Sequence, residues 1–265
     1  MEQVRDHATL AIFLVIAAIS AAILWYIARA RAGRELFLRR IPGLGAVDDA
    51  VGRSTEMGRP VLFSLGLGGL NVITFAGLAV LQYVAKATAQ FRARIIVPVA
   101  EAQVFPVVRE VCRDTYQAAG HDQEVGWDDV RYLSGGQFAW AMAVAGLMNR
   151  ERVGSVFYFG SHAAESLLLA ETAHHAGAIQ VAAVPSDSLP QIPFFIAACD
   201  YTIFGEEFYA ASAYLSREPV MVGSLRGQDV GKLILGGIVA LGALWATIVQ
   251  LAQEWLPKLL GPLGF

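Results

Sequence analysis

Two long segments of this chain carry no charged side chain, and they lie close to its two ends. Residues 8–28 read ATLAIFLVIAAISAAILWYIA, and residues 233–253 read LILGGIVALGALWATIVQLAQ. A helix of about 20 apolar residues is long enough to cross a hydrocarbon core of about 30 Å. Each segment therefore predicts a transmembrane helix. Trp25 and Tyr26 end the first one, where aromatic side chains prefer the membrane interface.

The start of the chain also has to be compared with a secretory signal peptide. A signal peptide has a basic start, a shorter apolar core and a cleavage site of small residues. Here the start is MEQVRDH, the apolar core is long, and arginines follow it directly. We therefore expect an uncleaved anchor.

The second segment contains four small residues that lie close along one side of a helix: Gly236, Gly237, Ala240 and Gly242. Small residues let helices approach closely in lipid, although glycine is common in membrane helices in any case. A role in helix packing and no specific role are both open at this point.

The charges beside the two segments predict how the chain is oriented. The first segment is preceded by Arg5 alone and followed by five arginines: Arg29, Arg31, Arg34, Arg39 and Arg40. Arg226 and Lys232 precede the second segment, and only Lys258 follows it. Basic residues favour the cytoplasmic side. We expect a multi-pass protein of the cell membrane, with the central region cytoplasmic and the N-terminus and C-terminal tail outside.

A third uncharged stretch, Pro60–Ala85, could be taken for another span, which would place residues 86–232 outside. It begins with the strand-like run VLFSL, breaks at Gly66-Leu67-Gly68-Gly69 and restarts at Asn71. Asparagine is a favoured residue at the start of a helix. We therefore expect a strand, a glycine turn and a helix at the start of an α/β domain.

From Val61 onwards, short β-branched runs alternate with longer helical ones, which predicts a parallel sheet with right-handed crossovers. The fold class is α/β: an open, mostly parallel, Rossmann-like sheet with helices on both faces. The expected strands are 61–65, 93–97, 130–133, 153–159, 179–184 and 201–204. The expected helices are 71–90, 101–119, 136–150, 163–175, 190–198 and 206–215. The expected organisation is a transmembrane helix at 8–28, a basic connector with a short helix at 29–59, a cytoplasmic domain at 60–227, a transmembrane helix at 233–253 and a tail at 254–265.

Composition excludes several classes of function. The net charge is −3 and there is no arginine-rich recognition element, so we expect no nucleic-acid partner. Cys112 and Cys199 lie far apart, and two thiols make neither a disulfide framework nor a zinc site. We expect no metal site. Only 16% of the residues are charged, which is low for a soluble domain and fits a chain that partly faces lipid.

Ligands of open parallel sheets bind beyond the carboxyl ends of the strands. The residues at those positions are the candidates for ligand binding: Gly66, Gly68, Gly69, Asn71, Glu101, Ser134, Ser161, His162, Asp187 and Glu206. No catalytic residue is assigned among them.

The glycine turn SLGLGGLN can bring backbone amides close to a phosphate at a helix N-terminus. It is not a P-loop, because the Lys-Ser/Thr pair is absent, and it lacks the third glycine of a dinucleotide fingerprint at the usual spacing. A tight turn that simply needs glycine is the alternative. No cofactor is firmly implied.

Three further motifs suggest chemistry but also have plainer explanations. Ser161 could be a nucleophile, but with Glu165 it also fits a helix-capping arrangement, which we favour. Glu171, His174 and His175 have the spacing of one half of a di-iron site, whereas such a site needs two such helices. The Glu206-Glu207 pair suits the first turn of a helix, and it could instead serve as acid and base.

The stretches IPGLGAVDDAVGRSTEMGRPVLF, CDYTIFGEEFYAASAYLSREP and GSLRGQDVGK resemble an uncharacterised family of prokaryotic membrane proteins, known only as a domain of unknown function. The resemblance covers most of the chain, including the last apolar segment. It supports the architecture and implies no catalytic residue.

These observations give three hypotheses. The first is a membrane-anchored scaffold that forms homo-oligomers or holds a partner membrane protein at the lipid bilayer. The second is a membrane-tethered domain that binds a nucleotide or another small ligand as a sensor or regulator. The third and weakest is a hydrolase that uses Ser161 or the Glu206-Glu207 pair, so an enzyme is not favoured.

Overall fold

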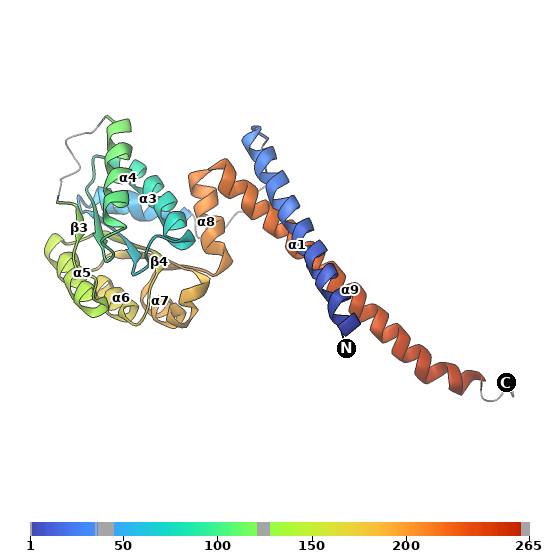
Figure 1. The fold of residues 1–265 in the computed structure, drawn as a ribbon. Helices are drawn as coiled ribbons and strands as arrows, with labels where there is room; N and C mark the ends of the chain where they lie inside the picture. Colours follow the sequence, from blue (N-terminus) through green and yellow to red (C-terminus); the bar gives the residue numbers. More distant parts are fainter. Residues whose placement is uncertain (1, 35, 37–44, 121–127, 261–265) are drawn as a thin grey trace. The chain divides into compact units, whose positions relative to one another are not determined.

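The computed structural model describes residues 2–34, 36, 45–120 and 128–260. The chain divides into two compact units (Figure 1). Helices α1 (Glu2–Arg31) and α9 (Pro219–Leu260) form the first, and the elements from α2 to α8 form the second. Much of the expected connector (37–44), residues 121–127 and the last residues of the tail (261–265) lie outside the described residues.

The second unit alternates strands and helices as the sequence predicted. Its strands are β1 (Val61–Gly66), β2 (Ile95–Val99), β3 (Val130–Tyr132), β4 (Ser155–Ser161), β5 (Ile179–Val184) and β6 (Tyr201–Phe204). Its helices are α2 (Gly45–Glu56), α3 (Val72–Gln90), α4 (Phe105–Ala118), α5 (Gln137–Glu151), α6 (Glu165–His175), the 3-10 helix η2 (Ser186–Gln191), α7 (Ile192–Ala198) and α8 (Glu206–Ser216).

The largest difference from the expected helices is at the start of α4. The sequence predicted a helix from Glu101, whereas α4 begins at Phe105 with Pro106 in its first turn. Proline is favoured there, because the first amides of a helix have no partner within it. The helix expected from Pro190 is also shorter, because Pro190 belongs to η2 and α7 begins at Ile192.

The six strands form one parallel sheet in the order β3-β2-β1-β4-β5-β6. The chain first adds strands outward from β1 to β3. It then returns to the other side of β1 and adds β4, β5 and β6 in the opposite direction. The direction of winding therefore reverses between β1 and β4, at the centre of the sheet. The predicted α/β class with a parallel sheet is confirmed, and the strand order is new information.

Helices cover the sheet from two sides, with α5, α6 and α7 on one side and α3 and α4 on the other (Figure 1). On the side of α5, α6 and α7, buried strand residues meet Trp140, Leu169 and Phe195. On the other side, the rings of Phe63, Phe157 and Phe159 stack together, and Phe208 of α8 packs against Phe159. Because both faces are covered, five of the strands are apolar almost throughout.

The third uncharged stretch is built into this second unit. β1 pairs with both β2 and β4, and α3 follows it after the glycine turn. The predicted strand, turn and helix are therefore confirmed. Gly77 brings α3 close to the sheet, since a Cβ at this position would lie 2.6 Å from the carbonyl oxygen of Phe159. Gly77 thus lets α3 pack closely on the sheet, as the third glycine of a dinucleotide fingerprint does, although it does not lie at the spacing of that fingerprint.

In the first unit, α1 and α9 pack along each other in opposite directions. A Cβ on Gly223 would lie 2.5 Å from Ile27 Cα, and one on Gly227 would lie 2.5 Å from Ile23 Cα. The next contact of this series joins Gly231 to Ile19. The small residues that meet α1 are thus these three, whereas an added Cβ on Gly236, Gly237 or Gly242, for which a packing role was open, would have no described atom within 4 Å.

Three helical segments are long and apolar enough to cross a membrane by length and composition: Ile12–Arg31, Val72–Gln90 and Pro219–Gln250. In an apolar stretch of 18 residues within the middle segment, 56% of the residues are buried in the second unit, whereas such a stretch in each terminal segment has no buried residue. The two terminal helices are therefore long and apolar enough to span a membrane, as the sequence predicted.

Candidate functional site

The candidate site lies at the carboxyl edge of the sheet, where the winding reverses between β1 and β4. The backbone of the two strands meets directly here: Leu67 donates its N–H to the carbonyl oxygen of Ser161 at 2.8 Å. Gly66 has a φ of +73°, and a Cβ on it would lie only 1.9 Å from that same oxygen. Only glycine fits at this crossing of the two strands.

The glycine turn continues into α3 through a capped helix start. Asn71 Oδ1 accepts the N–H of Thr74 at 2.9 Å, as predicted for a cap residue. The hydroxyl of Thr74 donates back to the carbonyl oxygen of Gly69 at 2.5 Å. Gly68 and Gly69 present their backbone between this cap and two side chains of the same edge, Ser161 and Gln103. The turn is therefore held in one conformation by its own hydrogen bonds.

Ser161 and Asp187 form the exposed polar pair of the site. The hydroxyl of Ser161 donates to Asp187 Oδ2 at 2.8 Å, and that of Ser188 donates to Asp187 Oδ1 at 3.0 Å. The expected role of Ser161 as a helix cap is wrong, because α6 begins at Glu165 after Ala164 and has no side-chain cap. Ser161 instead ends β4, which runs two residues further than predicted.

His162, next to Ser161 in the chain, is buried, and its ring contacts other buried groups. Its Nε2 lies 3.1 Å from Ser64 Oγ, and its Nδ1 lies 3.0 Å from the carbonyl oxygen of Gly160. Its backbone N–H donates to Ser188 Oγ. Burial lowers the pKa of the His162 imidazole, with the nearby charge of Glu165 acting in the opposite direction. Both ring nitrogens are thus engaged, and neither is recorded in a bond to the Ser161 hydroxyl.

Glu165 is fully buried and joins the starts of two helices. Its Oε1 accepts a hydrogen bond from the N–H of Ala163 at 2.8 Å, and its Oε2 accepts one from Nε2 of Gln137 at 2.7 Å. Gln137 is the first residue of α5, so this carboxylate connects the start of α5 to the start of α6. Neither residue was among the predicted site residues. A polar side chain in the first turn of a helix has many possible partners, and the sequence does not choose among them.

The remaining candidates are spread along the edge. Glu101 follows β2, next to β1, in the turn before α4. Ser134 follows β3 and accepts the N–H of Gly136 in a local turn. Glu206 begins α8 beyond β6. Ser134 and Glu206 each follow a strand two places from the centre, about 10 Å away at the usual strand spacing. The structure therefore brings together Gly66, Gly68, Gly69, Asn71, Ser161, His162 and Asp187, and leaves these two at the periphery.

Tyr209 of α8 is a further residue of this edge that the sequence did not indicate. Burial raises the pKa of its phenol, and the negative charge of Asp187 raises it further. Its hydroxyl therefore stays protonated near neutral pH and can donate a hydrogen bond. Within the described part of the chain, no group of three or more His, Cys, Asp or Glu side chains is arranged to hold a metal ion.

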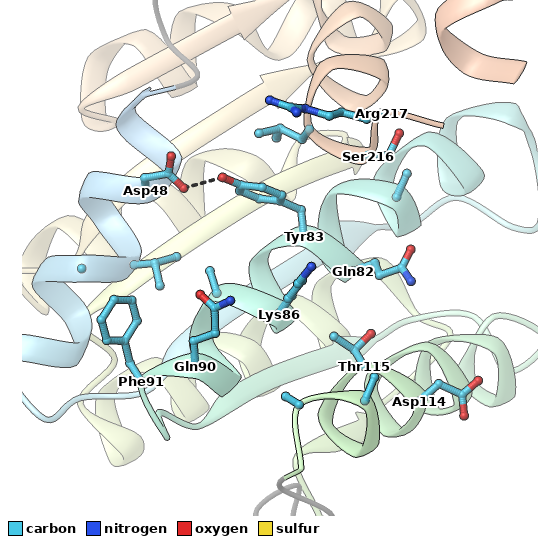
Figure 2. Close-up of a pocket in the computed structure, with 17 residues that line it drawn as sticks. Asp48, Gln82, Tyr83, Lys86, Gln90, Phe91, Asp114, Thr115, Ser216 and Arg217 are labelled. Atoms are coloured by element: carbon cyan, nitrogen blue, oxygen red, sulfur yellow. Dashed lines mark hydrogen bonds between the residues drawn. The ribbon is translucent and has the colours of Figure 1, made fainter. Parts of the chain in front are cut away.

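A separate pocket of about 1160 Å³ lies on the outer side of α3, between α2, α4 and the end of α8 (Figure 2). Tyr83 donates its hydroxyl to Asp48 Oδ1 at 2.7 Å across it. Burial and this bond raise the pKa of Tyr83 to about 12. The pocket is lined by the second half of α3, which runs away from the carboxyl edge, so it is distinct from the candidate site.

Comparison with known proteins places the chain in a family. No curated protein and no solved structure matches it. A family model described as a domain of unknown function (DUF6754) matches residues 1–256, which is nearly the whole chain. The match includes α1, all but the last four residues of α9 and every strand of the sheet. The protein is therefore a member of the DUF6754 family.

Proposed function

We propose that this protein is a membrane-tethered domain that binds a small molecule at the carboxyl edge of its sheet. The strand order carries this proposal. The order β3-β2-β1-β4-β5-β6 is that of doubly wound, Rossmann-type domains, which bind ligands where the winding reverses. The glycine turn and the Ser161–Asp187 pair follow β1 and β4, the two strands at that point.

The side chains of the edge favour a particular ligand chemistry. The segments that follow the six strands contain Glu101, Asp187, Glu206 and Glu207, and no lysine or arginine. A bare phosphate group would meet negative charge here without a balancing cation. Hydroxyl or amine groups, by contrast, can donate to Asp187, and a hydroxyl can also accept from Tyr209. The proposed ligand is a small molecule rich in hydroxyl or amine groups, or a nucleotide that arrives with a divalent cation.

The exposed surface of α1 and α9 supports the proposal that these helices tether the protein to a membrane. Large apolar side chains of α1 and α9 are exposed along the helices, among them Phe13, Leu24, Leu233, Val239 and Trp245. Such a surface is stable in lipid and costly in water. The excess of arginines in the last turn of α1 and after it favours a cytoplasmic position for the second unit, with both chain ends on the other side.

Thermal unfolding of the full chain in nanodiscs, with a panel of polyols, amines, sugars and Mg²⁺–nucleotides, tests the binding. A ligand at 100 times its dissociation constant stabilises a protein by about 2.7 kcal/mol. For a unit of this size that corresponds to a rise in melting temperature of roughly 5–10 °C. Asp187→Asn should abolish the shift, and Thr172→Ala, a hydroxyl on α6 far from the edge, should keep it. Equal shifts in the Asp187→Asn variant and the unchanged protein would place the ligand elsewhere.

A scaffold that assembles from several copies is the second candidate, and exposed apolar side chains near the same edge favour it. Phe138 and Met142 lie one turn apart on α5 and are 60% and 62% exposed. Val72 and Phe75 at the start of α3 are 73% and 57% exposed. Mass photometry in nanodiscs tests it: a Phe138→Ser, Met142→Ser double variant should lower the number of copies. Phe91→Ser, equally exposed but at the other end of α3, is the control.

A further inference from the structure

We propose that the amino edge of the sheet, opposite the candidate site, is a binding surface for the anionic headgroups of a lipid bilayer. This rests on the proposal that α1 and α9 insert into a membrane. The surface consists of five arginines that precede the three central strands: Arg59, Arg92, Arg94, Arg150 and Arg152. We call this set the arginine edge.

The register of the sheet brings these arginines together. Val61 of β1 is aligned with Ile95 of β2 on one side and with Ser155 of β4 on the other. Neighbouring strands lie about 4.8 Å apart, so the residues before these positions share a strip roughly 10 Å wide. A Cβ added to Gly154 would lie 2.9 Å from Arg59 Cβ, which places Arg59 directly beside the start of β4.

Among the described residues, two of these arginines have carboxylate partners and three do not. Arg94 pairs with Asp129 at 2.6 Å and with Glu151 at 3.3 Å, and Arg150 also reaches Glu151. Arg131 of β3 contributes a further contact to Glu151, at 3.4 Å. Among the described residues, no ion pair is recorded for Arg59, Arg92 or Arg152. Within the described part of the chain, these three guanidinium groups have no carboxylate partner, which makes them the candidates for binding an anion outside the protein.

The backbone shows that arginine is used here at a conformational cost. Arg92 and Arg152 have φ of 53° and 51°, a left-handed conformation that helices usually reserve for glycine at their ends. Among described residues other than glycine, positive φ occurs only in these two and in Arg217. The three follow α3, α5 and α8, and each of these helices ends at the amino side of the sheet. Glycine would make these turns without strain, so the side-chain charge is the feature that arginine adds.

The position of the arginine edge in the chain favours a bilayer as its partner. Arg217, the third arginine with positive φ, is two residues before the start of the apolar helix α9 in the chain. Anionic lipids of the cytoplasmic leaflet attract basic groups that are held close to the surface. The opposite edge carries carboxylates and no lysine or arginine after its strands, so only one edge of the sheet suits this partner.

Energy transfer in nanodiscs tests the proposal with the full chain. A donor dye on Met57→Cys reports the arginine edge, and a dye on Leu70→Cys reports the carboxyl edge, because both side chains are exposed. Cys199→Ser removes one native thiol. Cys112 is buried, and burial raises the pKa of its thiol to about 12, so it does not react at neutral pH. The acceptor is a dye on the lipid headgroups.

The expected result is higher transfer from position 57 in phosphatidylglycerol-containing nanodiscs than in pure phosphatidylcholine ones, with loss at about 0.5 M salt. Position 70 should show no such difference. Arg92→Gly and Arg152→Gly, combined with Arg59→Gln, should weaken the docked state by about fivefold for each arginine removed. The glycine changes relieve backbone strain, so a purely structural role for these arginines predicts unchanged docking and equal or higher thermal stability.

The control is Lys86→Gln with Arg113→Gln, which removes basic charge from α3 and α4 and should leave the transfer unchanged. Energy transfer that does not depend on lipid charge overturns the proposal. Charge-dependent transfer that is unchanged in the Arg59→Gln, Arg92→Gly, Arg152→Gly triple variant also overturns it. Transfer that ignores lipid charge but is accompanied by binding of soluble polyglutamate would also overturn it, in favour of an acidic protein partner. A chain that does not co-elute with nanodiscs at all refutes the tether itself, whereas co-elution without charge-dependent transfer refutes only the docking.

Discussion

His162 Nε2 lies 3.1 Å from Ser64 Oγ, a contact that joins the residue after β4 to the middle of β1. The bonds around it define its direction. His162 Nδ1 faces the carbonyl oxygen of Gly160, which only accepts, so Nδ1 carries the proton and Nε2 accepts from Ser64. Ser64 Oγ in turn accepts the N–H of Gly66 at 3.2 Å. A neutral histidine therefore fixes the two strands on either side of the reversal point.

This contact predicts a pH dependence of stability. Burial lowers the pKa of His162 below its ordinary value of 6.5, so the unfolded chain binds a proton that the folded chain excludes. Stability then increases with pH up to about 6.5 and is lost as the pH falls below it. As the pH falls below 6.5, the unchanged protein should lose more stability than His162→Gln, measured by urea unfolding in detergent. His175→Gln, at an exposed position, should follow the unchanged protein. Parallel pH profiles for all three would contradict a neutral buried histidine.

Gly77 and Gly146 form a matched pair of helical glycines with opposite predictions. A Cβ on Gly77 would lie 2.6 Å from Phe159 O and from Leu65 Cδ2, so Gly77→Ala should destabilise the second unit by about 1–3 kcal/mol. Gly146 in α5 has nothing within 4 Å of such a Cβ. Gly146→Ala should therefore stabilise by about 0.5–1 kcal/mol through helix propensity alone. Chemical denaturation measures both, and a Gly77→Ala variant as stable as Gly146→Ala would show that α3 does not approach the sheet this closely.

Gly227 allows α1 and α9 to pack together. Gly227→Leu would place a branched side chain where Ile23 Cα lies 2.5 Å from an ideal Cβ, so the two helices should separate. Spin labels on Leu24 and Gln228, both exposed, should broaden each other's spectra in nanodiscs only while the helices are paired. Gly237→Leu is the control, because no described atom lies within 4 Å of that position. Broadening that persists in Gly227→Leu would refute the close contact.

The candidate site was only partly predictable from the sequence. The positions after the strands could be found, because strand ends are local features that glycine and asparagine mark. The partners could not. Ser161 donates to Asp187 across 26 residues of sequence and does not cap its own helix, and Glu165 reaches Gln137 of another helix. Both carboxylates bond to groups that the fold brings close, and no local spacing indicates such pairs.

The sequence by itself determined the type and place of nearly every helix and strand, because these follow from hydrophobic period, glycine turns and uncharged length. It also identified Pro60–Ala85 as strand, turn and helix. Only the tertiary structure decided the strand order, the reversal between β1 and β4 and the pairing of α1 with Gly223, Gly227 and Gly231. The physical reason is that parallel strands join through long crossovers, which leave several orders open to the same pattern of elements. The choice among them depends on how side chains such as Phe63, Phe159 and His162 pack together once the chain is folded.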